Sequence, residues 1–279
     1  MEYKKAYENA CSILKEAGVV EYELDARLLL EEVCHTNMNT LLIHGDRLLS
    51  TEEIDRYDDF VKQRAARKPL AYIVGHQEFM GLDFKVTSDV LVPNQDTETL
   101  VEEALRELSV GMNFLDLCTG SGCIALSLLN YMPDTTAVAT DLSKKALEVA
   151  KTNSTLLNLE DRIKFENVDL FPSETDKRFD MIVSNPPYIP TKVIETLPEE
   201  VKNGEPYMAL DGAEDGLIFY KRIVEKAPQL LFSSGYLMFE IGYDQGMAVK
   251  KLMEDAGFHE VCVVKDLGGN DRVVKGVYY

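Results

Sequence analysis

From about residue 96 to the end of the chain, short apolar segments alternate with segments of helical periodicity. The apolar segments have the length of strands, and we place them at 113–117, 136–140, 163–168, 179–184 and 236–241. The first predicted helix of this region lies between residue 96 and the strand at 113–117. Its apolar residues are Leu100, Val101, Ala104, Leu105 and Leu108. Regular alternation of strands and helices predicts an α/β fold with a mostly parallel sheet wrapped by helices.

The chain closes with two further strands, near 261–264 and 272–277. The short loop between them contains Gly268-Gly269-Asn270-Asp271, residue types that favour a tight turn. We therefore expect an antiparallel hairpin at one edge of the sheet.

Residues 1–70 have a different pattern and predict a small helical domain. Ser50 and Glu53 form a capping box, and Ile54, Tyr57 and Val61 follow at helical spacing. Residues 70–92 contain β-type runs among turn residues, so we expect a β linker or hairpin at 71–92. The α/β domain would then occupy residues 93–279.

Composition limits the classes of function. The chain has 279 residues and a formal charge of −19, with 29 basic residues against 48 acidic ones. Nucleic-acid binding relies on basic side chains, so we expect no direct nucleic-acid contact and favour a basic protein surface as partner.

No apolar run is long enough to span a membrane, so we expect no membrane partner. Five cysteines without a CxxC pair indicate a reducing cytoplasm. The four histidines lack metal-site spacing, so we expect no metal.

One local cluster of basic residues runs against the acidic composition. It consists of Lys62, Arg64, Arg67 and Lys68 at the end of a predicted helix. The cluster can be read as a contact for RNA or another anion. We favour the second interpretation, a solvated face at the end of the helix.

Polar and glycine residues follow the predicted parallel strands. Asp116 and the loop Cys118-Thr119-Gly120-Ser121-Gly122 end the first strand, and Asp141, Asp169 and Asn185 end the next three. Ligands of open α/β sheets bind beyond the carboxyl ends of strands, so these residues should converge on one crevice. The glycines let backbone approach a ligand at a helix N-terminus, and Asp141 suits the two hydroxyls of a ribose.

Two nucleotide-like ligands fit this pattern. Gly120, Gly122 and Ala125 satisfy the relaxed dinucleotide fingerprint, which indicates NAD. Asp116 would repel a pyrophosphate but attract an ammonium group. S-adenosyl-L-methionine combines an ammonium group, a ribose and an adenine, so we favour it over NAD.

The tetrapeptide Asn185-Pro186-Pro187-Tyr188 follows the fourth strand. The nitrogen of an amide or a ring amino group is a poor nucleophile because its lone pair is delocalised, so chemistry there requires two acceptors for its N–H bonds. The Asn185 side chain and the Pro186 carbonyl supply two acceptors. Pro187 stiffens the loop, and Tyr188 offers a flat face for stacking. The alternative is a rigid turn that only ends a strand.

These motifs resemble those of a known family. The run 115–122 resembles the first motif of class I S-adenosylmethionine-dependent methyltransferases, and 185–188 resembles the signature of their amino- and amide-nitrogen members. The match then narrows to the peptide chain release factor N5-glutamine methyltransferases. It rests on Pro69–Gly75, Glu78–Phe84, Val92-Pro93 with Asp96-Thr97-Glu98, Asn185–Pro190 and Gly268–Val273, and it covers essentially the whole chain.

The resemblance implies a Rossmann-like class I methyltransferase fold and a specific reaction. The enzyme would transfer a methyl group from S-adenosyl-L-methionine to the glutamine of the Gly-Gly-Gln loop of bacterial class 1 release factors, leaving S-adenosyl-L-homocysteine. The helical domain would bind the release factor. The implied site residues are Asp116, Cys118, Thr119, Gly120, Ser121 and Gly122 for the methionine portion, Asp141 for the ribose, Asp169 and Leu170 for the adenine, and Asn185, Pro186, Pro187 and Tyr188 for the glutamine amide, with Asn185 also bordering the donor.

Two positions depart from the family pattern. Cys118 stands where many relatives have Gly, and we therefore expect an ordinary backbone conformation there. Asn94-Gln95 stands where Arg-Pro is common, which puts in doubt any Arg contact made by this loop.

Two other functions remain open. An adenine-N6 DNA or guanine-N2 RNA methyltransferase can carry the same tetrapeptide, although the acidic composition counts against it. A non-catalytic module that senses S-adenosylmethionine and docks to a partner is the alternative outside enzymes, and the intact tetrapeptide argues against it.

Overall fold

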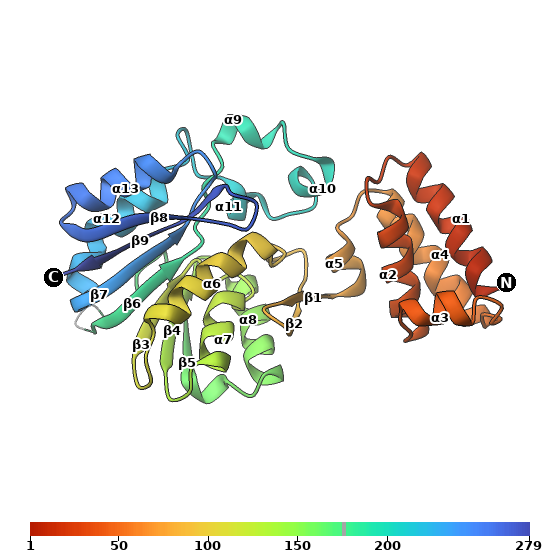
Figure 1. The fold of residues 1–279 in the computed structure, drawn as a ribbon, viewed down its shortest axis with the longest axis horizontal. Helices are drawn as coiled ribbons and strands as arrows, with labels where there is room; N and C mark the ends of the chain where they lie inside the picture. Colours follow the sequence, from red (N-terminus) through yellow and green to blue (C-terminus); the bar gives the residue numbers. More distant parts are fainter. Residues whose placement is uncertain (175–176) are drawn as a thin grey trace. The chain divides into compact units, whose positions relative to one another are not determined.

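A computed structural model of the chain describes residues 1–174 and 177–279. The described residues form two compact units (Figure 1). The first, the helical unit, comprises Met1–Gly75 and Pro198–Gly204, and the second, the sheet unit, comprises His76–Leu197 and Glu205–Tyr279. None of the helices formed by the described residues is both long enough and apolar enough to cross a bilayer.

The helical unit is built around one small apolar core. Its helices are α1 (Tyr3–Glu16), α2 (Tyr22–Cys34), α3 (Met38–Ile43), α4 (Thr51–Ala65), α5 (Leu70–Val74) and α10 (Glu199–Lys202). The predicted capping box of Ser50 and Glu53 begins α4 with both of its hydrogen bonds present, which confirms that prediction. Tyr57 of α4 is buried against α2, and its hydroxyl donates to the Ala26 carbonyl at 2.8 Å.

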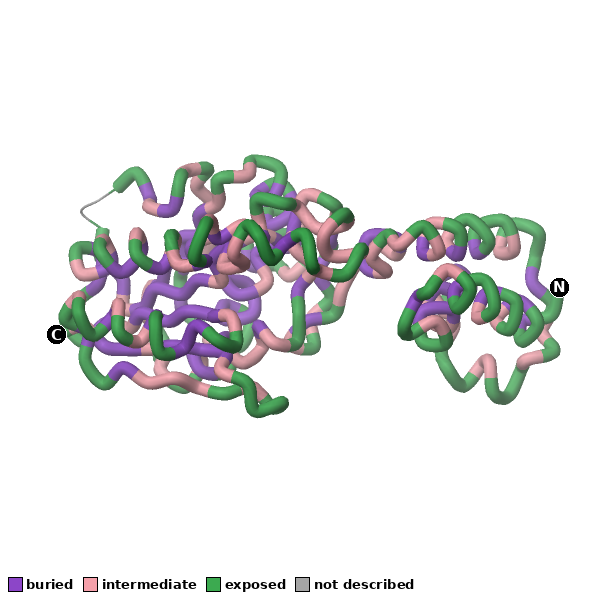
Figure 2. The backbone as a smooth tube through the Cα atoms, turned by 90° about the horizontal axis from the view of Figure 1, so that it is seen from above, coloured by how far each residue is buried: buried purple, intermediate pink, exposed green. Residues whose placement is uncertain are grey.

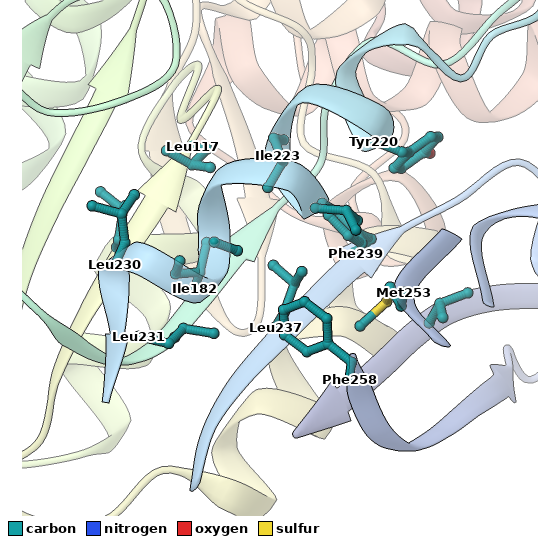
Figure 3. Close-up of a cluster of buried hydrophobic side chains, with 14 of the residues drawn as sticks. Leu117, Ile182, Tyr220, Ile223, Leu230, Leu231, Leu237, Phe239, Met253 and Phe258 are labelled. Carbon is teal, nitrogen blue, oxygen red and sulfur yellow. The ribbon is translucent and has the colours of Figure 1, made fainter. Parts of the chain in front are cut away.

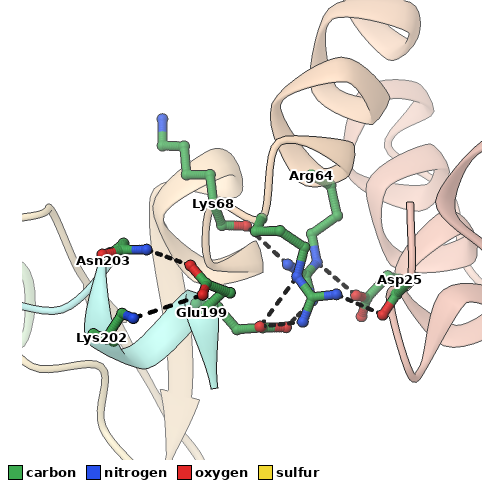
Figure 4. A network of polar contacts seen from close by, with 9 residues as sticks. Asp25, Arg64, Lys68, Glu199, Lys202 and Asn203 are labelled. Atoms are coloured by element: carbon green, nitrogen blue, oxygen red, sulfur yellow. Dashed lines mark hydrogen bonds and ion pairs between the residues drawn. The ribbon is translucent and has the colours of Figure 1, made fainter. Parts of the chain in front are cut away.

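In the basic cluster at the end of α4, Arg64 and Arg67 pair with carboxylates of the helical unit. Figure 4 shows Arg64 with Asp25. Arg64 is buried, its Nε lies 2.7 Å from Oδ2 of Asp25, and its Nη2 lies 3.0 Å from Oε1 of Glu200. Arg67 also pairs with Glu200. Both interpretations drawn from the sequence are therefore wrong for Arg64, because its charge is neither solvated nor available to an anion.

The segment after α4 differs in part from the expected β linker. Residues 70–74 form α5 and are not extended. The antiparallel hairpin β1 (His76–Phe79) and β2 (Leu82–Lys85) follows, as the β-type pattern predicts. Phe79 is 1% exposed and packs edge-on against Phe84. Phe79 therefore serves the core and does not line the site described below.

The sheet unit contains a seven-stranded sheet in the order β5-β4-β3-β6-β7-β9-β8. Its strands are β3 (Asn113–Leu117), β4 (Thr136–Asp141), β5 (Ile163–Asn167), β6 (Phe179–Ser184), β7 (Leu231–Glu240), β8 (Phe258–Lys265) and β9 (Asp271–Tyr278). The first five are parallel and the last two form an antiparallel hairpin at one edge. The predicted sheet and its edge hairpin are confirmed.

Helices cover both faces of this sheet (Figure 1). The principal ones are α6 (Gln95–Glu107), α7 (Cys123–Tyr131), α8 (Lys144–Leu156), α12 (Ile218–Leu230) and α13 (Gly246–Asp255). Shorter elements are the 3-10 turn η1 (Glu160–Arg162), α9 (Thr191–Ile194) and α11 (Tyr207–Leu210). The alternation of strand and helix along the chain thus produces a three-layer α/β arrangement.

The central strands are buried on both faces because each face has its own core (Figure 2). Leu115 and Leu117 point to the core formed with α12 and α13, whereas Phe114 points to the core formed with α6 and α7. Figure 3 shows the first core, with Ile223 of α12 and Met253 of α13 packed over the sheet. Full burial of one such apolar side chain is worth about 1.5–3 kcal/mol, so these two layers hold the strand ends in place.

The turn from β3 into α7 begins at Cys118, whose backbone is left-handed with φ of 60°. The expectation of an ordinary conformation at this position is wrong. The turn requires the left-handed conformation whichever residue stands there, so Cys118 adopts it despite its Cβ. The backbone holds this strain because Thr119 N donates to the Thr140 carbonyl at 3.0 Å.

The strain at Cys118 is measurable. We expect Cys118→Gly to be more stable than Cys118→Ala by about 1 kcal/mol. Glycine avoids the penalty of the left-handed conformation in the folded state, and its greater conformational entropy in the unfolded state offsets only part of that gain. Both variants lose the thiol, so their difference isolates the Cβ. Urea unfolding checks it, and an alanine variant as stable as the glycine variant would show that the turn is unstrained.

The ion pairs of Glu200 predict a pH dependence. Burial opposes its charge, but hydrogen bonds from Arg67 and Arg64 hold the pKa of Glu200 down to about 2, against an ordinary 4.5. Because the folded pKa is depressed, the contribution is complete above about pH 5 and disappears as pH falls towards 2. Glu200→Gln should lower the free energy of unfolding of the helical unit by about 2 kcal/mol at pH 7 and much less at pH 3.

Glu199→Gln is the matched control for this measurement, since the Glu199 side chain is 58% exposed and its partners among the described residues are the nearby Lys202 and Asn203. Thermal unfolding of both variants at pH 7 and pH 3 makes the comparison. Equal effects of the two substitutions would contradict the role given to Glu200.

Candidate active site

A cavity of about 370 Å³ lies at the carboxyl ends of β3, β4 and β6. Nine of the residues predicted for the site line it: Cys118, Thr119, Gly120, Ser121, Asp141, Asp169, Leu170, Asn185 and Pro187. Four others do not line it, namely Asp116, Gly122, Pro186 and Tyr188. The structure therefore brings together residues from four distant parts of the chain, as the strand-end argument expects.

The loop after β3 is held by hydrogen bonds at both of its sides. Gly120 N donates to Oδ2 of Asp141 at 2.9 Å, which ties the loop to the end of β4. Thr119 Oγ1 donates to Oδ2 of Asp116 at 2.5 Å. Burial raises the pKa of Asp116 to about 7, although the Thr119 hydrogen bond opposes the rise. Asp116 is thus enclosed beneath the loop, and it is connected to the cavity through Thr119.

Asp141 is fixed by the backbone while it faces the cavity. Its Oδ1 accepts from Ser143 N at 2.8 Å, and its Oδ2 accepts the Gly120 bond. Burial raises the pKa of Asp141, and these two amides oppose the rise. A carboxylate has about four acceptor positions, so two remain for hydroxyls of a ligand.

Asp169 and Leu170 lie where the chain leaves the strand that follows Asp141. Asp169 is solvent-accessible and pairs with Arg222 of α12, whose Nη2 lies 2.9 Å from Oδ2. Leu170 has a φ of 68°, and its carbonyl accepts from Thr140 Oγ1 at 2.5 Å. Phe219, one turn before Arg222, lines the cavity beside them. Sequence reasoning did not identify Phe219 or Arg222.

Asn185 lies directly after β6 and lines the cavity. Its Nδ2 donates to Oγ1 of Thr97 in α6 at 3.3 Å. Within the part of the chain that the structure describes, no protein group donates to Oδ1 of Asn185. The side-chain carbonyl is therefore the free end of this amide.

Tyr188 lies beneath the cavity wall, with its ring packed against the first core. Its hydroxyl donates to Oε1 of Glu240 in β7 at 3.3 Å. Burial, followed by the neighbouring charge of Glu240, raises the pKa of Tyr188 well above its usual range. Gln245 Nε2 donates to the Tyr188 carbonyl at 3.0 Å. A Cβ at Gly216 would lie 2.3 Å from the same carbonyl, so only glycine allows this close approach.

The outer wall of the cavity was not predicted from the sequence. Tyr207 and Met208 line it and are each 51% exposed. Their segment has no periodicity that would mark it as part of a site. Asn94 also lines the cavity, and its side chain caps α6 by accepting from Asp96 N at 3.1 Å. The departure at Asn94-Gln95 thus supplies a helix cap.

The described residues offer no group of three or more His, Cys, Asp or Glu side chains that could hold a metal ion. The residues that line the cavity bring carboxylates, backbone amides of the 118–122 loop, the Asn185 amide and hydroxyl groups, among them that of Thr97. This set suits recognition of hydroxyl and amide groups.

Two family models match the chain. One, described as PrmC N-terminal domain, matches residues 5–75, and the other, described as Methyltransferase small domain, matches residues 93–201. Among solved structures, a methyltransferase from Pyrococcus furiosus has a TM-score of 0.54 and 19% identity, over 71% of this chain and 89% of that one. This likeness supports the fold alone.

Related sequences match over nearly the whole length. The release factor glutamine methyltransferase of Clostridium acetobutylicum is 40% identical over 281 residues, covering 99% of both chains. That of Geobacter sulfurreducens is 42% identical over 263 residues, covering 94% of this chain and 92% of the relative. With identity of this level running from end to end, the chain belongs to the release factor glutamine methyltransferase family.

Proposed function

We propose that this protein transfers a methyl group from S-adenosyl-L-methionine to the N5 side-chain amide of the glutamine in the Gly-Gly-Gln motif of bacterial class 1 release factors. The observation that carries the proposal is the free carbonyl of Asn185 on the wall of the strand-end cavity. The full-length similarity to release factor glutamine methyltransferases supports it. It also weighs against the nucleic-acid, NAD and non-catalytic alternatives.

The methyl donor of this enzyme is S-adenosyl-L-methionine, which supplies an electrophilic methyl carbon on a sulfonium. The donor set fits this molecule, because the Gly120 region is open and Asp141 keeps acceptor positions for ribose hydroxyls. We assign the methionine portion to the 118–122 loop, with Asp116 acting on it through Thr119. Asp169 and Leu170 are assigned to the adenine region, with Phe219 as an additional apolar contact.

The glutamine amide is assigned to Asn185 and its neighbours. Oδ1 of Asn185 and the Pro186 carbonyl would accept the two N–H bonds, Pro187 would border the amide, and the Tyr188 ring would support this loop from below. These contacts would hold the glutamine amide in line with the methyl donor. Alignment of two reactants can lower the activation free energy of their reaction by up to about 7–11 kcal/mol. The chain's own contribution is therefore mainly position.

The substrate class also guides the remaining assignments. The helical unit, expected at residues 1–70, is proposed to bind the release factor, and the unit with the seven-stranded sheet, expected at residues 93–279, is proposed to catalyse the transfer. The hairpin expected as part of a linker at 71–92 packs into the core of the second unit through Phe79 and Phe84. Because release factors act in translation termination, we place the reaction in the cytoplasm. The charge of −19 favours a basic surface on the protein substrate.

The direct test uses labelled S-adenosylmethionine with a purified bacterial class 1 release factor. We expect label to enter the release factor in about one equivalent, and none to enter a release factor whose Gly-Gly-Gln glutamine is replaced by alanine. Equal labelling of both release factors would overturn the proposed substrate site. Labelling of added tRNA or DNA in place of the release factor would revive the nucleic-acid alternative.

Asn185→Ala tests the assigned acceptor. We expect kcat to fall by at least about 10²-fold because the glutamine amide loses an aligning contact, while the affinity for S-adenosylmethionine changes little. Methyl-transfer kinetics measure the first quantity, and isothermal titration calorimetry measures the second. Near-normal turnover in this variant would remove Asn185 from its role.

A further inference from the structure

A buried carboxylate, that of Glu240, lies behind the tetrapeptide. Glu240, the last residue of β7, is 3% exposed. Its Oε1 accepts from the Tyr188 hydroxyl at 3.3 Å. Its Oε2 is buried and meets no donor in hydrogen-bonding geometry among the described residues. A buried acceptor without a partner is costly, so its neighbours need an explanation.

The neighbour that matters is Thr97, which is 3% exposed in the first turn of α6. Thr97 lies close to the Glu240 carboxyl: burial raises the pKa of that carboxyl, and the Thr97 hydroxyl opposes the rise. The same hydroxyl oxygen accepts from Nδ2 of Asn185 at 3.3 Å. Thr97 therefore stands between Glu240 and the proposed substrate-binding amide.

The Thr97 hydroxyl has a single hydrogen, and the acceptor of that hydrogen determines whether a donor or an acceptor faces the Asn185 amide. If the hydrogen of Thr97 is directed to an ionised Glu240, only lone pairs face Asn185, and those lone pairs accept an N–H. Nδ2 then turns to Thr97 and Oδ1 turns to the cavity. The two ends of an amide have nearly the same size, so packing alone would not choose between them.

We infer that Glu240 is a positioning residue that fixes Asn185 through Thr97, with the Asn185 carbonyl directed into the cavity, and that it fixes Tyr188 directly. One carboxylate would thus orient both ends of the tetrapeptide. The inference rests on the proposed function, because it matters only if Oδ1 of Asn185 accepts from the glutamine amide.

The surroundings of Glu240 make this arrangement sensitive to pH. The titratable and charged groups that face it are Arg272 of β9, Asp96 of α6, Tyr188, Tyr220 of α12 and Cys123 of α7. Burial raises the pKa of Glu240 to about 7, while Thr97, Arg272 and Tyr188 oppose the rise. The ionised form is therefore lost as pH falls below about 7.

Protonation would reverse the direction of the hydrogen bonds. A protonated Glu240 donates to Thr97, which frees the Thr97 hydrogen for Oδ1 of Asn185. The Asn185 amide would then present its NH₂ to the cavity, where it cannot accept from the substrate. We therefore expect kcat to fall about tenfold per pH unit below the pKa of Glu240.

Thr97→Val and Thr97→Ser form the matched pair for the test. Valine keeps the shape of threonine but has no hydroxyl, so kcat should fall by about 10²-fold and lose its inflection near pH 7. Serine keeps the hydroxyl and should recover most of the lost turnover together with the inflection. Calorimetric affinity for S-adenosylmethionine close to that of the wild type would show that both variants are folded.

The rate is measured between pH 5.5 and 8.5 at saturating donor and saturating release factor. Saturation matters because Asp116, whose pKa is also near 7, lies under the donor loop and should affect donor affinity and not kcat. Glu240→Gln is a second variant, expected to lower kcat and remove the inflection without lowering donor affinity.

Wild-type turnover and an unchanged inflection in Thr97→Val would overturn the inference. If Asn185→Ala is nevertheless inactive in the same assay, the proposed function stands and only the role of Glu240 fails. If Asn185→Ala is also fully active, the assigned role of Asn185 fails with it.

Discussion

The site depends on the register of three neighbouring parallel strands. Leu117 of β3 pairs with Thr140 of β4 on one side and with Ser184 of β6 on the other. The residues that follow this row are Cys118, Asp141 and Asn185, and all three line the cavity. A slip of one residue would reverse the side chains of a whole strand, which the apolar cores on both faces do not permit.

Hydroxyl groups reinforce this row of strand ends. Ser184 Oγ donates to the Leu117 carbonyl at 2.7 Å, and Thr140 Oγ1 donates to the Leu170 carbonyl. Both are buried, so these bonds satisfy carbonyl groups where the regular ladder stops. These bonds fix the side of the cavity formed by the 118–122 loop, where Cys118 keeps its left-handed conformation. The outer wall around Tyr207 and Met208 is more exposed and has no comparable set of buried bonds in the described structure.

Most of the fold can be read from the sequence because the pattern and the packing agree. The strands 113–117 and 179–184 were placed at their observed bounds, and the edge hairpin follows from its short loop. The predictions were wrong where the conformation of a turn, or an ion-pair partner distant in sequence, determined the structure in place of the local pattern. Position 118 needs a left-handed residue for steric reasons, and Arg64 finds its carboxylates in Asp25 and Glu200, which are distant in sequence.

The candidate site was only partly predictable for the same reason. Polar residues at the ends of apolar strands can be recognised in the sequence, so Asp141 and Asn185 were predicted. The residues that hold them in place lie on other elements of the fold and were not. Two signals were nonetheless present in the sequence. Thr97 lies three residues before Leu100 on the buried face of α6, and Glu240 interrupts the otherwise apolar run 236–241. A polar residue at a position that the periodicity assigns to the core indicates a buried partner or a site.

The central claim is geometric: two carbonyl oxygens of the loop after β6 hold an amide NH₂ beside the methyl donor. The most direct measurement is a crystal structure of the protein with S-adenosyl-L-homocysteine and a release factor bearing its Gly-Gly-Gln loop. We expect the glutamine nitrogen to lie about 2.7–3.2 Å from both Oδ1 of Asn185 and the Pro186 carbonyl oxygen. A glutamine bound elsewhere in the cavity, or facing Nδ2 of Asn185, would contradict it.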